Sequence, residues 1–334
     1  MRTIRVHAFL SAKGGVGKSS LAVATAKLLA DAGRETILID ADMTGTSLAD
    51  GLDLCAPQVA LDPRGGYEFK ARDSVFLSRA QTWHARYRRA VAMANADDLD
   101  PRPPPPFLND LLIYALDEDR DVSVASLLWR HEREDGVRYL PSSPVIADLE
   151  VAARWLNRED GDIWVRQLAW VLSRLVEQTA NLSDVVFDLP PGLFAFTTRV
   201  LALCNHLATL DRTVSLPDGF PRLERHNILW EFDPVLVTSQ DRNDLNVAVE
   251  WFARNRADLP TLRLVANRLT DSLEKVRSNA RETLGALGLQ GTIPIEGVGI
   301  VPNSLGVIFS RGHDLPLTDD VRTLDSILRA GRAT

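Results

Sequence analysis

A glycine-rich stretch near the start of the chain constrains the fold more than any other feature. Residues 11–20 read SAKGGVGKSS, follow an apolar run over 6–10 and precede a helical pattern over 17–32. Glycines between a strand and a helix let successive backbone N–H groups face one point, and the helix N-terminus adds partial positive charge there. This order predicts a phosphate-binding loop, with a glycine-rich turn that holds no ligand as the alternative.

The side chains of this loop fit the same interpretation. Lys18 would reach the β- and γ-phosphates of a nucleotide, and the Ser19 hydroxyl would be a ligand of Mg²⁺. The pattern G-x-x-x-x-G-K-[ST] is complete except at Ala12, where a glycine is usual, and the next residue, Lys13, is a second lysine. The loop is therefore a variant of the common nucleotide-binding motif.

Acidic residues end two further apolar runs. Asp40 and Asp42 follow the run over 35–40, and Asp188 ends the run that begins at Val185. Ligands of open parallel α/β sheets bind at the carboxyl ends of the strands, so we expect these carboxylates near the phosphates. Asp188 could hold a Mg²⁺-bound water as a Walker B acid does. The alternatives are a turn or helix cap for Asp40 and Asp42, and a strand-end turn for Asp188.

Apolar runs alternate with helical patterns along most of the chain. Strands are predicted over 4–10, 35–40, 137–140, 185–188, 233–238, 262–268 and 292–296. Helices are predicted over 17–32, 107–116, 123–134, 164–178, 194–206, 244–254, 273–287 and 324–328. This order indicates an α/β fold in which a doubly wound, mainly parallel sheet carries helices on both faces.

Two stretches interrupt this alternation, and we interpret them as insertions at about 56–121 and 207–232 in a single domain over 1–334. The first holds a basic, helical stretch at 79–92 with Trp83 and Tyr87, followed by a proline run at 103–106. Basic residues beside aromatic ones could bind a nucleic-acid backbone or an acidic partner. A solvated helix face is the alternative.

The composition limits the compartment and the partners. The chain has 38 basic and 45 acidic residues, a net charge of −7, which argues against a surface covered by nucleic acid but allows a local basic patch. Its two cysteines, Cys55 and Cys204, form no C-x-x-C pair, so we expect a cytoplasmic protein without a disulfide framework. The chain has no run of 18 apolar residues, and its first residues lead directly into a strand, so neither a membrane span nor a signal peptide is expected.

The motifs, taken in order, resemble the MinD/ParA family of deviant Walker A P-loop ATPases, which belongs to the SIMIBI class. The matching pieces are KGGVGKSS at 13–20, TILIDAD at 36–42, VVFDLPPG at 185–192, LVANR at 264–268 and IPIE at 293–296. The resemblance covers about 1–55, 122–204 and 233–318, and the insertions at 56–121 and 207–232 fall outside it.

The resemblance implies an ATPase that binds ATP, ADP and Mg²⁺. Lys13 would be the signature lysine that reaches phosphates bound by a partner chain, and Asp42 would orient or deprotonate the attacking water. The phosphates would be cradled by Gly14, Gly15, Val16, Gly17, Lys18, Ser19 and Ser20. Adenine would be contacted by Asn267, Arg268, Pro294 and Glu296. Magnesium would be held by Ser19, Asp40 and Asp188.

The family resemblance also implies how such an enzyme would act. ATP would favour a homodimer and hydrolysis would release it, so the chain would be a slow switch that positions DNA or a protein partner. Surface residues such as Lys275, Arg277 and Arg281 could bind DNA non-specifically, whereas the short C-terminal tail does not favour membrane attachment.

Three other readings remain open. The chain could be an interaction subunit whose insertions capture a partner while the nucleotide is mainly structural. It could also be a small-molecule kinase or ligase similar to dethiobiotin synthetases. The stretch DADMTGTS at 40–47 is similar to one in Mrp-type iron–sulfur carriers, but those carry a C-x-x-C that this chain lacks.

Overall fold

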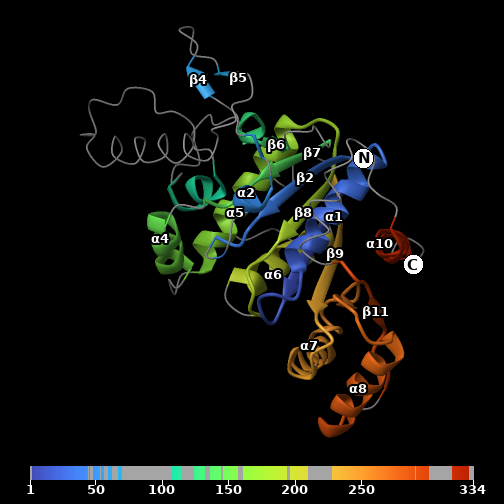
Figure 1. Ribbon diagram of the computed structural model, residues 1–334. Coiled ribbons are helices and arrows are strands. Elements are labelled where there is room, and N and C mark those ends of the chain that lie inside the picture. Colours follow the sequence, from blue (N-terminus) through green and yellow to red (C-terminus); the bar gives the residue numbers. More distant parts are fainter. Residues whose placement is uncertain are drawn as a thin grey trace.

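A mostly parallel β-sheet forms the centre of the computed structural model (Figure 1). The structure describes residues 2–43, 45, 48–52, 54–55, 59–61, 67–69, 107–114, 124–131, 136–143, 146–156, 161–193, 196–209, 228–289, 291–300 and 318–330. Within these residues the sheet has nine strands in the order β11-β10-β9-β1-β8-β2-β7-β6-β3.

The first strand of the chain lies in the middle of the sheet. β1 (Arg2–Ser11) pairs in parallel with β8 (Leu182–Asp188) on one side and with β9 (Ile228–Thr238) on the other. The parallel part continues through β2 (Glu35–Asp40), β7 (Val137–Leu140), β10 (Arg263–Ala266) and β11 (Ile295–Gly297). The carboxyl ends of these seven strands therefore meet at one edge.

Antiparallel strands extend the other end of the sheet. β6 (Trp129–His131) pairs with β7, and β3 (Leu54–Cys55) pairs with β6. A separate two-stranded sheet consists of β4 (Val59–Leu61) and β5 (Tyr67–Phe69).

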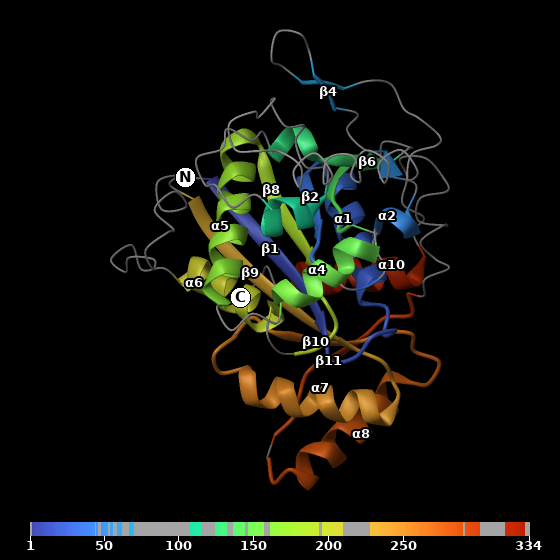
Figure 2. The same ribbon diagram turned by 90° about the vertical axis from the view of Figure 1, so that its left-hand side faces the viewer.

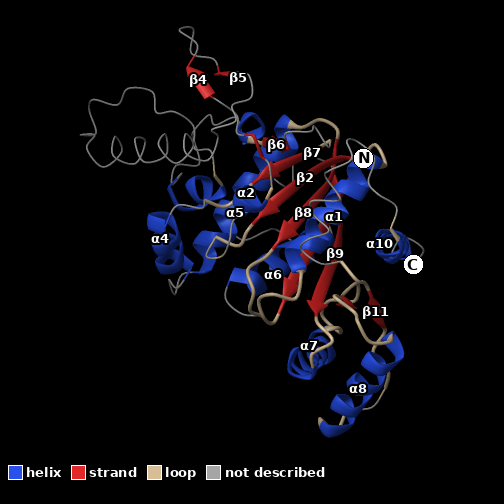
Figure 3. Cartoon of the chain, viewed as in Figure 1, coloured by secondary structure: helices blue, strands red, loops and turns tan. Residues whose placement is uncertain are grey.

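Helices cover both faces of the sheet (Figures 1 and 3). One face carries α1 (Lys18–Asp31) and α10 (Asp319–Ala330). The other carries α4 (Ile146–Leu156), α5 (Gly161–Gln178) and α6 (Phe196–Thr209). Seen in Figure 2, α7 (Arg242–Asn255) and α8 (Leu273–Ala286) lie together beside β10 and β11. Shorter helical segments are α2 (Leu48–Gly51), η1 (Asp110–Tyr114) and η2 (Val124–Leu127).

Alternation along β1 divides the core between these two faces. Ile4, Val6, Ala8 and Leu10 join the apolar cluster of α5 and α6, whereas Phe9 joins that of α1 and α10. Successive side chains of a strand point to opposite faces, so a central strand needs apolar residues at almost every position. The predicted doubly wound α/β fold is thereby confirmed.

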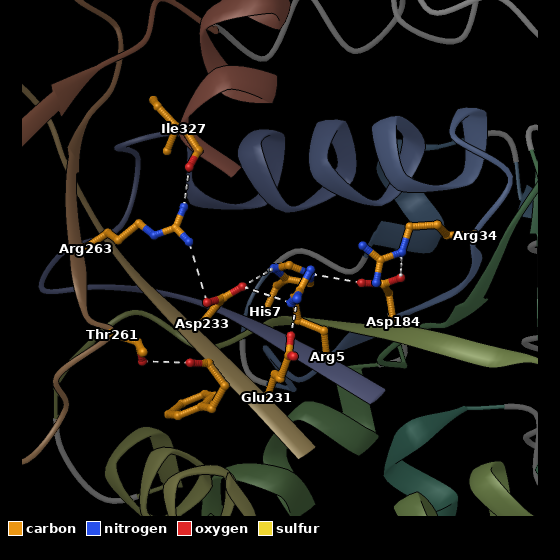
Figure 4. Close-up of polar contacts among 10 residues, drawn as sticks. Arg5, His7, Arg34, Asp184, Glu231, Asp233, Thr261, Arg263 and Ile327 are labelled. Atoms are coloured by element: carbon orange, nitrogen blue, oxygen red, sulfur yellow. Dashed lines mark hydrogen bonds and ion pairs between the residues drawn. The ribbon is translucent and has the colours of Figure 1, made fainter. Parts of the chain in front are cut away.

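Buried charges on the α1 face link neighbouring strands (Figure 4). His7 Nε2 lies 3.1 Å from Asp184 Oδ1 in β8, and His7 Nδ1 lies 3.6 Å from Asp233 Oδ2 in β9. Asp233 is 3.5 Å from Arg263 Nη2 in β10. The other terminal nitrogen of Arg263 donates to the backbone carbonyl of Ile327, so this network also holds α10.

The structure differs from the sequence prediction in three places. The helix predicted over 123–134 is η2 followed by β6, in which Trp129 and His131 are buried while Arg130 is exposed, as in a strand. α4 was not predicted. The second insertion is shorter than 207–232, because α6 continues to Thr209 and β9 begins at Ile228.

The first expected insertion also ends earlier than predicted. Its basic residues at 79–92 and its prolines at 103–106 lie outside the described residues. Phe107, Leu108 and Asn109 are fully buried, and Leu111 and Leu112 belong to the main apolar cluster. Residues 107–114 therefore pack as part of the main body and not as part of an added segment.

Candidate nucleotide-binding site

The loop between β1 and α1 has the backbone that a phosphate-binding loop requires. Gly15 and Gly17 have φ of +83° and +86°, in the region that favours glycine. Gly17 is the N-cap of α1, and no side chain caps the helix. The backbone N–H groups in the first turn of α1 are therefore not capped from within the loop, at the end of the helix that attracts anions.

Lys18 is the first residue of α1 and is almost buried, with 6% of its side chain exposed. Its ammonium group donates a hydrogen bond to Asp188, which ends β8 and is itself buried. Asp188 is the neighbour of Phe9 in β1 and of Asp40 in β2. The pairing brings together the two residues predicted from separate motifs, and it neutralises a lysine that burial would otherwise make costly. Next in α1, Ser19 is half-buried and Ser20 is buried.

Asp40 is also buried, but its carboxylate binds donors of its own chain. Oδ2 accepts from Leu48 N at 2.9 Å, from Ser142 Oγ at 2.7 Å and from Ser142 N at 3.3 Å. Oδ1 accepts from Asp42 N at 3.2 Å. Burial raises the pKa of Asp40 to about 7, and the neighbouring Asp188 adds to this rise. The Asp40 carboxylate therefore holds the turn that carries Asp42, and its role as a magnesium ligand stays a prediction.

Asp42 lies in the turn that follows β2 and is half-buried. The turn is tight, because a Cβ added at Gly45 would lie 2.6 Å from Asp42 Oδ2. This fixes the carboxylate over Gly45, at the same edge of the sheet as the glycine-rich loop.

Asn267 follows β10 and is hydrogen-bonded to the glycine-rich loop. Its Nδ2 donates to the carbonyl of Val16 at 3.1 Å and to that of Ile300 at 2.8 Å. Its Oδ1 is buried and has no hydrogen-bond partner among the described residues, and the same holds for Nε of Arg268. A buried acceptor without a donor is costly, which fits a ligand that brings an N–H group to it.

Among the described residues, no hydrogen bond joins Asn267 to Pro294 or Glu296, whose contacts with adenine stay a prediction. Glu296 lies in β11 opposite Val265, which precedes Asn267 by two residues, and the exposed Pro294 comes before the strand. Burial raises the pKa of the Glu296 carboxyl, and the opposing charges are those of Arg263 and Arg277. Instead, Ile300 reaches Asn267, because β11 ends at Gly297 and the chain continues past β10.

The Lys13 side chain, predicted to reach a partner chain, forms an ion pair within its own chain in this structure. Its ammonium group lies 2.7 Å from Asp244 Oδ1 in the first turn of α7, with 48% of the lysine side chain exposed. The hydrogen bond to Asp244 raises the pKa of Lys13. Asp244 also accepts a hydrogen bond from Ser239 Oγ at 2.7 Å, so it is held in place from two sides.

Sequence reasoning missed Asp244, Ser142 and Asn109. Ser142 comes directly after β7, so the strand-end argument that selected Asp40 would have selected it as well. Asn109 and Asp244 carry no such signal, because their partners lie far away in the sequence.

The basic residues of α8 have acidic partners on the same helix or next to it. Lys275 pairs with Asp271, and both Arg277 and Arg281 pair with Glu274. These partners offset the charges that we considered for DNA binding.

A comparison with protein families matches residues 3–67 to the family described as ParA, NUBPL iron-transfer P-loop NTPase. This range contains the glycine-rich loop, Lys18 and the turn with Asp40 and Asp42. Residues 3–67 are therefore similar to P-loop NTPases of the ParA type. No curated protein matches the chain.

Solved structures with similarity to the chain have low sequence identity. The septum site-determining protein MinD from Pyrococcus horikoshii, complexed with Mg-ADP, is 15% identical over 99% of both chains with a TM-score of 0.49. A plasmid partition protein from Borrelia burgdorferi bound to AMPPNP is 12% identical over 98% of both chains, with a TM-score of 0.49. Cobyrinic acid a,c-diamide synthase from Mycobacterium smegmatis, with ADP and magnesium, is 17% identical over 99% of this chain and 96% of that one, with a TM-score of 0.47.

No group of three or more His, Cys, Asp or Glu side chains within the described ranges could hold a metal ion. Burial raises the pKa of the Cys204 thiol to about 12, which disfavours its thiolate. In the same ranges, no helix has the length and apolarity to span a membrane.

Proposed function

We propose that the chain is a P-loop NTPase that binds and slowly hydrolyses ATP, and that ATP binding makes it dimerise to position a protein partner or DNA. The observation that carries the proposal is the arrangement around the glycine-rich loop. Lys18 and Asp188 meet at the start of α1, and Asn267 packs against the same loop with a buried, unpaired acceptor. Lys18 and Asp188 are suited to binding phosphates with their metal ion, and Asn267 is suited to binding a nucleotide base.

The acceptor of Asn267 supports adenine over guanine. Its Nδ2 is already engaged by two carbonyls, so only Oδ1 is left for a ligand. An oxygen acceptor can take a hydrogen bond from the 6-amino group of adenine, whereas it would meet the carbonyl of guanine without a hydrogen. A buried acceptor facing an acceptor costs binding energy, which gives a physical basis for ATP as the nucleotide.

For hydrolysis, Lys18 and the first N–H groups of α1 would bind the phosphates, and Ser19 and Asp188 would hold Mg²⁺. The ion, when bound, neutralises phosphate charge and orients the nucleotide. Asp42 would orient or deprotonate the attacking water, because its carboxylate is fixed over Gly45 and is half-buried. Asp40 would act indirectly, by holding the turn of Asp42.

For dimerisation, Lys13 would leave Asp244 and reach the phosphates bound to the second copy. The Lys13–Asp244 pair lies at the surface, where solvent screens the attraction, so breaking it costs little. ATP would shift the equilibrium because only its phosphates offer Lys13 a stronger partner across the interface.

Binding of Mg-ATPγS and the mass of the protein in solution test this proposal together. We expect wild type to bind the nucleotide and to double its mass in light scattering, Lys18→Ala to lose binding, and Lys13→Ala to bind but stay monomeric. Lys275→Ala, an exposed lysine that also pairs with an aspartate, is the matched control and should behave like wild type. A Lys13→Ala variant that still dimerises with the nucleotide, or a wild type that prefers GTP, would overturn the proposal.

A further inference from the structure

The loop after β7 touches the candidate site through Ser142. Both its hydroxyl and its backbone N–H donate to Asp40 Oδ2, at 2.7 and 3.3 Å. The same oxygen accepts from Leu48 N, and the other carboxylate oxygen accepts from Asp42 N. Because the Asp40 carboxylate accepts from both Asp42 N and Leu48 N, Ser142 contributes to the position of these two residues through Asp40.

The neighbours of Ser142 hold a different part of the chain. The carbonyl of Pro141 accepts from Leu108 N at 2.9 Å. On the other side, Ser143 N donates to Asn109 Oδ1 at 2.7 Å, and Ser143 Oγ donates to Asp148 Oδ2 at 2.6 Å. Three consecutive residues after β7 therefore join residues 108–109 and α4 to Asp40.

Residues 107–109 cannot shift freely within the core. Phe107, Leu108 and Asn109 are all fully buried, and the ring of Phe107 lies 5.0 Å from that of Trp129 in β6, measured between centroids. The residues just before Phe107 are the proline run 103–106, preceded by the basic stretch 79–92. Any displacement of the backbone at Phe107 therefore acts on residues that are packed in the core and hydrogen-bonded to the loop after β7.

We propose that Ser142 is a positioning residue for the nucleotide site and that Ser142 and Asn109 couple the segment 107–114 to the turn that carries Asp42. The inference rests on the proposed nucleotide binding. Displacement of residues 107–109 must break or carry along their bonds to Pro141 and Ser143, and Ser142 between them then changes its bonds to Asp40. A partner that displaces residues 107–109 would in this way alter nucleotide affinity, and the nucleotide would alter partner affinity by the same factor.

A double-mutant cycle on nucleotide affinity tests the coupling. The dissociation constant of Mg-ADP is measured by calorimetry for Ser142→Ala, Asn109→Ala and the double variant, at a temperature where circular dichroism shows each to be folded. Loss of one hydrogen bond should weaken binding by roughly fivefold for Ser142→Ala and by roughly threefold for Asn109→Ala. The double variant should lose clearly less than the product of the two.

Ser183→Ala is the matched control, because the Ser183 hydroxyl donates to the carbonyl of Glu35 at 3.2 Å, at the opposite end of β2. It loses a hydroxyl hydrogen bond of the same kind and should leave the dissociation constant unchanged. Lower stability alone does not change the affinity of a folded protein, so this readout separates positioning from a structural role. The proposal is wrong if Ser142→Ala binds Mg-ADP as tightly as Ser183→Ala does. It is also wrong if the affinity losses of Ser142→Ala and Asn109→Ala multiply in the double variant.

Hydrogen exchange on wild type gives a second test that needs no variant to fold. Saturating Mg-ADP should slow exchange at the amides of Leu108 and Ser143 by about threefold or more, while the amide of Leu245 in α7 serves as the internal reference. Unchanged exchange at both amides in a protein that binds Mg-ADP overturns the coupling alone. A wild type that does not bind Mg-ADP overturns the proposed function, and the coupling falls with it.

Discussion

The contact between Gly17 and Asn267 allows a sharp test of how the loop is built. A Cβ added at Gly17 would lie 2.3 Å from Asn267 Nδ2, whereas a Cβ added at Gly15 would meet none of the described residues within 4 Å. Both glycines have nearly the same φ, +83° and +86°. Gly15→Ala therefore tests backbone strain alone, and Gly17→Ala tests the same strain together with displacement of Asn267.

The expected magnitudes differ for this reason. A left-handed backbone costs an alanine about 1–2 kcal/mol relative to glycine, so we expect this loss of stability for Gly15→Ala. In Gly17→Ala the Asn267 amide must also leave the carbonyls of Val16 and Ile300. Two buried hydrogen bonds at about 1 kcal/mol each bring the expected loss to about 3–4 kcal/mol.

Urea unfolding followed by circular dichroism measures both losses. Adding Asn267→Ala to Gly17→Ala should lower the free energy of unfolding by almost nothing more, because the Asn267 side-chain amide is already displaced in Gly17→Ala. Equal losses for the two glycine variants, or additive losses in the double variant, would show that the side chain of Asn267 does not lock the loop.

Three further outcomes are expected. Burial raises the pKa of Asp40 from 3.8 to about 7 in the folded chain, so the folded state binds more protons between these values and the free energy of unfolding should fall as the pH rises through this window. In Asp40→Asn this fall should be absent from urea titrations. Asp244→Asn frees Lys13 and should strengthen Mg-ATPγS-dependent dimerisation by up to about fivefold in light scattering, and weaker dimers would contradict this. In a Cys55→Ser background, Cys204 should react with a thiol reagent only after urea unfolding, since its thiol is buried with a pKa near 12, and fast labelling of folded protein would refute this.

Local patterns predicted the loop, the central strands and the acids at their ends. The apolar run of β1 and the glycines and lysine after it are adjacent in sequence, so their roles can be inferred without knowing any partner. Asp188 and Lys18 came together as expected because parallel strands end at one edge of the sheet.

The errors arose where a residue depends on distant partners. The first residues of β9, 228–232, were assigned to the second insertion, but Glu231 among them pairs with Arg5 of β1 and so can lie in a central strand. Ser142 and its acceptor Asp40 are 102 residues apart in the chain, and Asn109 and Ser143 are 34 apart. A single sequence does not show such pairs.

The central place of β1 also determines when the protein can fold during its synthesis. His7 and its partner Asp184 are separated by 177 residues, and β9 follows later still. Ribosomes add about 5–20 residues per second, so roughly 10–35 s pass before the second of these residues exists. Throughout that time β1 has neither of its neighbouring strands complete for pairing. The nascent chain is then a substrate for chaperones that shield apolar segments, and its nucleotide loop cannot form until more than half of the chain has been made.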